Sequence, residues 1–219
     1  MKGLLKTVYR DYKNSDDNLV GKVHWKLISS PLVAKWTFGL KMIPGPAPKR
    51  YLFDLTTVLL KLELKKILSQ LKDSKILEIG VGNYAILSGW LSRHVNQHID
   101  ATDVDPGCVE SARKYIDANS FNVNAIQSDL FSSVQGKKYD LIFWNLPYYR
   151  DPVFLDGLFE QAPDMMADRA RLIIGYNTTP LPRKKVLEFL ERHDGLELDK
   201  VVTYSWNLHD LMVLKKTGN

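Results

Sequence analysis

The chain has 219 residues, of which 45% are hydrophobic and 25% charged, a globular composition with enough apolar residues for one sizeable core. It contains no run of about 18 apolar residues, and charged residues interrupt its first thirteen, which argues against a membrane span and against a signal peptide. Cys108 is the only cysteine, which excludes an intrachain disulfide, and no metal-ligand spacing is present, so we expect no metal site and a cytoplasmic location.

The first part of the chain is strongly basic. Residues 1–50 hold ten Lys or Arg against three Asp, whereas the rest of the chain is close to neutral. Such an arm suggests an anionic partner such as RNA, although solvated lysines on helices give the same count. Because prolines at 44, 46 and 48 favour a stiff, extended connection, we predict an N-terminal extension and hinge over residues 1–50 and the main domain over 51–219.

The main domain alternates helical and strand-like segments. Leucine spacing predicts an amphipathic helix over residues 52–71, and Asp105 followed by Pro106 predicts a helix start that continues to residue 119. Apolar runs rich in Ile, Val and Leu predict strands at 75–79, 98–103, 123–127, 139–144 and 171–176.

Most of these strands are separated by helical stretches, which is typical of a parallel sheet with right-handed crossovers. Residues 196–206 and 207–216 form two further strand-like runs with no helix between them. The sequence therefore predicts an α/β, Rossmann-like fold. Its seven-stranded, mostly parallel sheet has helices on both faces, a C-terminal antiparallel hairpin and a short N-terminal extension.

A glycine-rich turn follows the first predicted strand, in residues 78–85 (EIGVGNYA). Gly80 and Gly82 allow a sharp turn and a close approach of the backbone to a ligand. Asp103 ends the next strand and can accept hydrogen bonds from both hydroxyls of a ribose, while Asp129 after the third strand is placed to accept from an adenine amino group. We therefore predict a nucleoside site.

Glu78 distinguishes two kinds of nucleoside cofactor. A glycine turn followed by an acid also fits a dinucleotide site, but a pyrophosphate favours bare amides without a nearby negative charge. A carboxylate two residues before Gly80 suits the ammonium group of S-adenosylmethionine. A role for Glu78 in stabilising the loop is the alternative.

The fourth predicted strand ends in Trp-Asn-Leu-Pro-Tyr-Tyr, residues 144–149. A planar amine is a poor nucleophile because its lone pair is delocalised. A methyltransferase must therefore accept hydrogen bonds from both of its N–H groups. The Asn145 side-chain oxygen and the Leu146 carbonyl can accept them, Pro147 donates no competing N–H, and Tyr148 can stack on a flat acceptor. The alternative is a strand end that only builds a turn.

These segments together resemble a known family. The runs ILEIGVGNYAIL, ATDVDP, SDLF and YDLIFWNLPYY are similar to the motif series of class I S-adenosylmethionine-dependent methyltransferases of the N-methylating, Asn-Pro-Pro-Tyr type. FGLKMIPGPAP before the core is similar to release-factor glutamine methyltransferases, and Asn-Leu-Pro-Tyr is similar to rRNA adenine dimethyltransferases. Tyr84 stands where the family commonly has a third glycine. The resemblance implies cofactor roles for Glu78, Gly80, Gly82, Asp103, Asp129 and Asn145, and acceptor roles for Asn145, Leu146, Pro147 and Tyr148.

Several functions remain compatible with the sequence. The first is an S-adenosylmethionine-dependent N-methyltransferase that acts on adenine in RNA or on glutamine in protein. A small-molecule amine is a third possible acceptor, since the chain has no large recognition domain. An NAD-dependent oxidoreductase and a non-catalytic nucleoside-binding subunit are alternatives of other classes.

Overall fold

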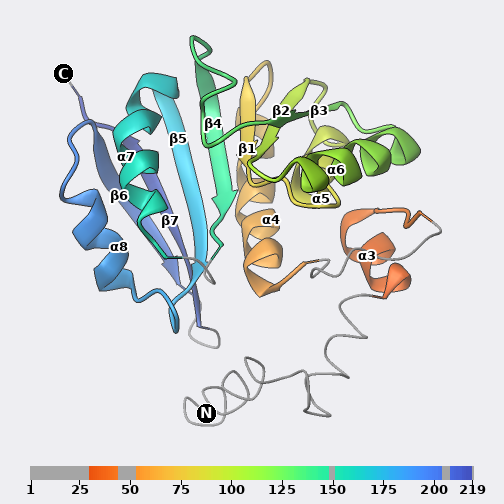
Figure 1. Ribbon diagram of the computed structural model, residues 1–219, viewed down its shortest axis with the longest axis horizontal. Coiled ribbons are helices and arrows are strands. Elements are labelled where there is room, and N and C mark those ends of the chain that lie inside the picture. Colours follow the sequence, from red (N-terminus) through yellow and green to blue (C-terminus); the bar gives the residue numbers. More distant parts are fainter. Residues whose placement is uncertain (1–29, 44–52, 148–150, 204–207, 219) are drawn as a thin grey trace.

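The computed structural model describes residues 30–43, 53–147, 151–203 and 208–218, and its centre is a seven-stranded sheet of order β3-β2-β1-β4-β5-β7-β6 (Figure 1). Strands β1 to β5 pair in parallel, and β7 is antiparallel to both β5 and β6. The predicted fold class and the C-terminal hairpin are thereby confirmed. The strands are β1 (Ile76–Ile79), β2 (Ile99–Asp103), β3 (Val123–Gln127), β4 (Tyr139–Asn145), β5 (Met166–Asn177), β6 (Leu196–Thr203) and β7 (His209–Lys216).

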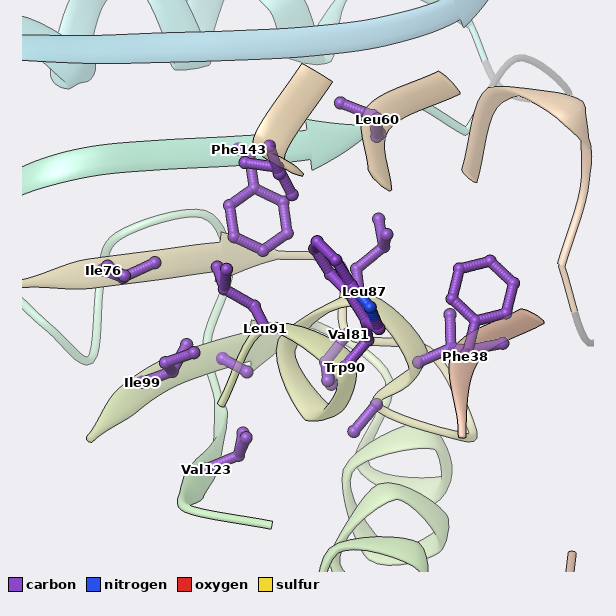
Figure 2. Close-up of a cluster of buried hydrophobic side chains, with 14 of the residues drawn as sticks. Phe38, Leu60, Ile76, Val81, Leu87, Trp90, Leu91, Ile99, Val123 and Phe143 are labelled. Carbon is purple, nitrogen blue, oxygen red and sulfur yellow. The ribbon is translucent and has the colours of Figure 1, made fainter. Parts of the chain in front are cut away.

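Helices cover both faces of this sheet. One core cluster joins helices α3 to α6 to alternate residues of the strands, for example Ile76 and Phe143, and Figure 2 shows part of it around Trp90. The intervening residues, such as Leu77 and Ile142, belong to a second cluster with α7 and α8. The helices are α3 (Pro31–Phe38), α4 (Leu55–Ile67), α5 (Ile86–Ser92), α6 (Pro106–Asn119), α7 (Phe154–Met165) and α8 (Arg183–Leu190), with a short 3₁₀ turn, η1 (Leu68–Gln70).

Local sequence explains where two of the helices begin. The Asp105 side chain accepts a hydrogen bond from the Gly107 amide and Pro106 is the first residue of α6, as predicted. Helix α4 begins after Asp54, whose side chain accepts from the Thr57 amide while the Thr57 hydroxyl accepts from the Asp54 amide. This reciprocal capping satisfies two backbone amides that the helix itself leaves unpaired.

Strand β5 is longer than predicted. It begins at Met166 rather than near residue 171, and Met166 pairs with Tyr139 across a register irregularity between Tyr139 and Leu141. Its first residues include the exposed Asp168 and Arg169, so this part of the strand carries no apolar run for a hydrophobicity pattern to detect.

Several predicted features lie outside the described residues. They are the first 29 residues of the basic arm, the Pro-rich hinge and Tyr148. Among the helices that the structure does describe, none is long and apolar enough to cross a membrane.

The strand order places the expected ligand site. From β1, the chain winds outward in one direction to β2 and β3 and then returns to start β4 on the other side of β1. Ligands of open α/β sheets bind at the carboxyl ends of the strands near such a reversal. The glycine turn after β1 and the end of β4 at Asn145 both lie at this point.

Candidate functional site

Gly80 and Gly82 of the turn are required for different structural reasons. Both have positive φ, +70° at Gly80 and +60° at Gly82. A Cβ on Gly80 would lie 2.6 Å from the Trp144 indole nitrogen, whereas a Cβ on Gly82 would meet nothing within 4 Å. Gly80 therefore allows close packing against β4, and Gly82 leaves the backbone beside open space, where a ligand can approach it.

Asp103 is attached directly to this turn. Its Oδ2 accepts a hydrogen bond from the Gly82 amide at 2.9 Å, and its Oδ1 accepts from the Asp105 amide at 3.0 Å. The Val81 amide also donates to the Thr102 carbonyl at 2.8 Å. Since each carboxylate oxygen has a second lone pair, Asp103 is held in place and can still accept hydrogen bonds from a ligand.

Asp129 lies in the loop after β3, at the same edge of the sheet. The Ser128 amide donates to the Asp103 carbonyl at 2.9 Å, and the Asp129 amide donates to the Ser132 hydroxyl at 3.2 Å. The Asp129 residue itself is exposed. The structure thus brings Gly82, Asp103 and Asp129 to neighbouring strand ends, as a nucleoside site requires.

Glu78 occupies a different environment from the other predicted residues. It lies within β1, is 4% exposed, and accepts a hydrogen bond from the Ser88 amide in the first turn of α5 at 3.0 Å. Burial raises the pKa of its carboxyl to about 8, and the negative charge of Asp103 adds to this shift while hydrogen bonding by Ser88 opposes it. Glu78 therefore makes the stabilising contact that the sequence left as an alternative, and its role toward a cofactor stays a prediction.

Tyr84, at the position of the family's third glycine, packs into the core. It is 4% exposed, and its ring meets Tyr115 of α6 edge to face at 5.0 Å between centroids. The next residue, Ala85, takes the left-handed conformation with φ +47° immediately before α5. The tyrosine thus connects the start of α5 to α6.

Asn145 ends β4 with its side chain fixed by the start of α4. Its Nδ2 donates to Asp54 Oδ1 at 3.1 Å and to Thr57 Oγ at 3.2 Å. Its Oδ1 is buried and has no hydrogen-bond partner. A buried polar atom without a partner is costly unless a ligand completes it, so this oxygen marks a site for a hydrogen-bond donor.

The next two residues are held by β5. The Leu146 amide donates to the Gly175 carbonyl at 2.8 Å, and the Leu146 side chain is 1% exposed. Pro147 follows and is half-buried. The strand therefore places the backbone after Asn145 firmly, up to the last described residue before Tyr148.

Sequence reasoning missed the residues that surround Asn145. Asp54 and Thr57 contact it directly, and beside them Thr56 Oγ lies 2.5 Å from Nδ1 of His209 on β7. Burial lowers the pKa of His209, an effect that the nearby charges of Asp54 and Asp210 oppose. The pattern Asp-x-x-Thr before a leucine run does predict a capped helix, but nothing in it predicts a contact with a residue 91 positions later.

Within the described part of the chain, no group of three or more His, Cys, Asp or Glu is placed to hold a metal ion. The polar groups at the site are instead backbone amides, carboxylates and one amide side chain, which suit an organic ligand with hydroxyl and amino groups.

A comparison of the sequence with models of protein families identifies the family of this chain. The model of the methyltransferase small domain matches residues 51–197, well over half of the chain. The chain belongs to this family. Its cofactor is S-adenosylmethionine, so the family favours a methyltransferase over the NAD-dependent oxidoreductase that the glycine turn alone allowed.

Individual relatives agree with this family. Over 85 residues, the chain is 35% identical to a candidate protein N5-glutamine methyltransferase of Methanocaldococcus jannaschii, covering 39% of the chain and 42% of that protein. It is 32% identical over 149 residues to a ribosomal RNA small subunit methyltransferase C of Chromohalobacter salexigens, covering 66% of the chain and 44% of the relative. The chain spans about half the length of the curated relatives it matches.

Solved structures share the fold. A methyltransferase from Pyrococcus furiosus superposes with a TM-score of 0.72 at 22% sequence identity, covering 90% of this chain and 99% of that one. The likeness supports the arrangement of sheet and helices described above.

Proposed function

We propose that this chain transfers a methyl group from S-adenosylmethionine to a planar nitrogen, with adenine in RNA as the first candidate acceptor and glutamine in protein as the second. The observation that carries the proposal is the buried, unpartnered Oδ1 of Asn145. Asn145 directly follows Trp144, whose indole nitrogen would lie 2.6 Å from a Cβ at Gly80 in the cofactor turn.

The residues at the carboxyl edge of the sheet fit the cofactor. The cofactor can approach the open backbone at Gly82 closely, and Asp103 retains lone pairs for its ribose hydroxyls. The exposed Asp129 can accept a hydrogen bond from the amino group of the cofactor's adenine. Glu78, buried beneath α5, would orient the ammonium group directly or through water. S-adenosylmethionine, when bound, supplies the electrophilic methyl group on its sulfonium.

The acceptor is prepared by hydrogen bonding. Asn145 Oδ1 accepts one N–H of the planar amine and the Leu146 carbonyl accepts the other, which makes the nitrogen lone pair more available for attack. Pro147 offers no N–H that competes for these acceptors. Tyr148 would stack on a base with a contact of about 1 to 3 kcal/mol. No general base is required before transfer, because the nitrogen gains a positive charge with the methyl group and releases its proton to solvent afterwards. Alignment, and electrostatics at the two carbonyls, would supply most of the rate.

Two observations support an RNA acceptor over the other classes. The first fifty residues carry a large excess of positive charge, and a relative covering 66% of this chain is named as a ribosomal RNA methyltransferase. The glutamine acceptor is supported by the relative named for that activity, at 35% identity over a shorter stretch.

The proposal is tested by separating cofactor binding from transfer. Asn145→Ala is expected to bind S-adenosylmethionine with nearly wild-type affinity and to lose at least about 100-fold in methyl transfer, since it removes a transition-state contact. Asp103→Ala is expected to weaken cofactor binding itself. The measurements are calorimetry with S-adenosylmethionine and with NADH, and transfer of a labelled methyl group to rRNA, to ribosomal and release-factor proteins, and to small amines.

Asn96→Ala is the matched control, since Asn96 is exposed in the loop before β2 at the opposite edge of the sheet. Tight binding of NADH without binding of S-adenosylmethionine would contradict the proposal. So would full methyl transfer by Asn145→Ala. Labelling of glutamine or of a small amine in place of RNA would correct the acceptor while keeping the reaction.

A further inference from the structure

Asp54 concentrates three hydrogen bonds on one oxygen. Its Oδ1 accepts from the Thr57 amide at 2.8 Å, from the Thr57 hydroxyl at 2.8 Å and from Asn145 Nδ2 at 3.1 Å. The first of these caps α4 and the last reaches across to the end of β4. One atom therefore connects the start of a helix to the proposed acceptor residue.

This arrangement allows the Asn145 amide only one orientation. Asp54 Oδ1 accepts from both the amide and the hydroxyl of Thr57, and the Thr57 hydroxyl gives its proton to Asp54, so both oxygens present lone pairs to Asn145. Turning the amide over would bring its oxygen against these acceptors and lose both hydrogen bonds. The oxygen of Asn145 is thus directed away from α4, where it is left unpartnered.

The position of Asp54 is itself fixed by the C-terminal half of the sheet. Thr56, two residues into the same turn, contacts His209 of β7, and a Cβ on Gly175 of β5 would lie 2.6 Å from the Thr56 methyl carbon. The beginning of α4 therefore sits directly on the strands that follow the acceptor segment.

We infer that Asp54 is a positioning residue for methyl transfer, which orients the Asn145 amide and requires an amide rather than a carboxylate at position 145. The inference rests on the proposed function of Asn145. An aspartate at 145 would face the Asp54 carboxylate at about the distance of the present 3.1 Å contact, and two such groups do not ionise together without a large cost.

A reciprocal exchange tests the requirement for an amide. Asn145→Asp alone is expected to lower kcat by at least about 100-fold, since it creates the pair of carboxylates. Combining it with Asp54→Asn removes one of the two facing negative charges, and kcat should recover by at least about tenfold. Asp54→Asn alone exchanges the carboxylate for a weaker, neutral acceptor and is expected to lower kcat by less than Asn145→Asp does.

A second variant separates positioning from helix capping. Serine caps helices as well as aspartate does, but it is too short to reach Asn145. Asp54→Ser should therefore keep the thermal midpoint and the affinity for S-adenosylmethionine, while kcat falls by about 10- to 100-fold with a smaller change in KM. The side-chain amide signals of Asn145 in ¹H–¹⁵N spectra, assigned by their loss in Asn145→Ala, should exchange faster with water in Asp54→Ser.

The spectra distinguish the two proposals because they need no acceptor. Faster exchange in Asp54→Ser supports the positioning contact, even if the wild type methylates none of the tested acceptors and the proposed function fails. Unchanged amide signals in Asp54→Ser would overturn the inference. A double variant no more active than Asn145→Asp would also overturn it.

Discussion

Glu78 is a carboxyl group whose charge the folded protein disfavours. It lies in β1 with 4% exposure, and burial raises its pKa from 4.5 to about 8. A group with a higher pKa in the folded than in the unfolded chain holds its proton more tightly in the fold. The folded state is therefore favoured at low pH, and this contribution is lost as the pH rises from about 4.5 toward about 8.

The pH dependence of stability should change when this carboxyl is removed. Glu78→Gln keeps an oxygen for the Ser88 amide and cannot ionise, so its free energy of unfolding should decrease less between pH 5 and 8 than that of the wild type. Urea unfolding at several pH values measures the difference. Parallel curves for the two proteins would show that Glu78 does not titrate in this range.

The cofactor side of the candidate site could be predicted in part from residue types alone. Glycines in a turn and acids at strand ends have local reasons, so the places of Gly80, Gly82 and Asp103 could be predicted from the sequence, and the structure brings them together. Glu78 contacts Ser88 from its buried place in β1, and its role toward a cofactor stays a prediction. The partners of Asn145 depend on how α4 crosses the sheet, which no local pattern contains.

At the scale of elements, the site depends on how closely α4 approaches β5. Gly175 pairs with Asn145 in the sheet, and its carbonyl accepts from the Leu146 amide. A Cβ there would meet Thr56 at 2.6 Å, Leu211 at 2.9 Å and Leu60 at 3.1 Å. The absence of a side chain at one strand position thus lets the start of α4 contact the end of β4.

Gly175→Ala should therefore push α4 away from the sheet. We expect a loss of stability of about 1 to 3 kcal/mol from overpacking, together with reduced methyl transfer because Asp54 and Thr57 move with the helix. Thermal unfolding and the transfer assay check these two effects. Gly136→Ala is a useful comparison, since a Cβ there meets nothing within 4 Å, although its φ of +78° adds backbone strain.

The elements themselves were predictable to different degrees. Strands β1 to β4 and helix α6 follow from compact apolar runs and from Asp105 with Pro106, and the structure confirms them. The early part of β5 escaped prediction because Asp168 and Arg169 are exposed there, and before Arg171 only Met166 pairs with β4. A local sequence pattern predicts a strand with a buried face better than it predicts an exposed extension of a strand.

For the whole molecule, charge is distributed unevenly along the chain. The first fifty residues are strongly basic and the remaining residues are nearly neutral. If this arm neutralises phosphates, binding of RNA should weaken with salt in proportion to the number of contacts, with a slope of about 0.7 per contact for single strands.

Replacing Lys2, Lys6 and Lys13 by alanine should then lower that slope by about 2, if each lysine contacts one phosphate. Filter binding or anisotropy of a labelled rRNA fragment over a range of salt concentrations measures it. The control replaces Lys65, Lys72 and Lys75, which are exposed on the side of the sheet away from the candidate site. Equal slopes for both triple variants would assign the basic arm no specific part in RNA binding.

The place of β7 in the sheet affects how the protein is made. Strand β7 follows β6 along the chain but lies between β5 and β6, and it supplies His209 to the start of α4. While a ribosome is still translating the segment before β7, β5 has an open edge and β6 has no neighbour with which to pair. Such edges attract other strands. The nascent chain therefore completes its sheet only after residues 209–216 emerge, and until then we expect it to depend on chaperones.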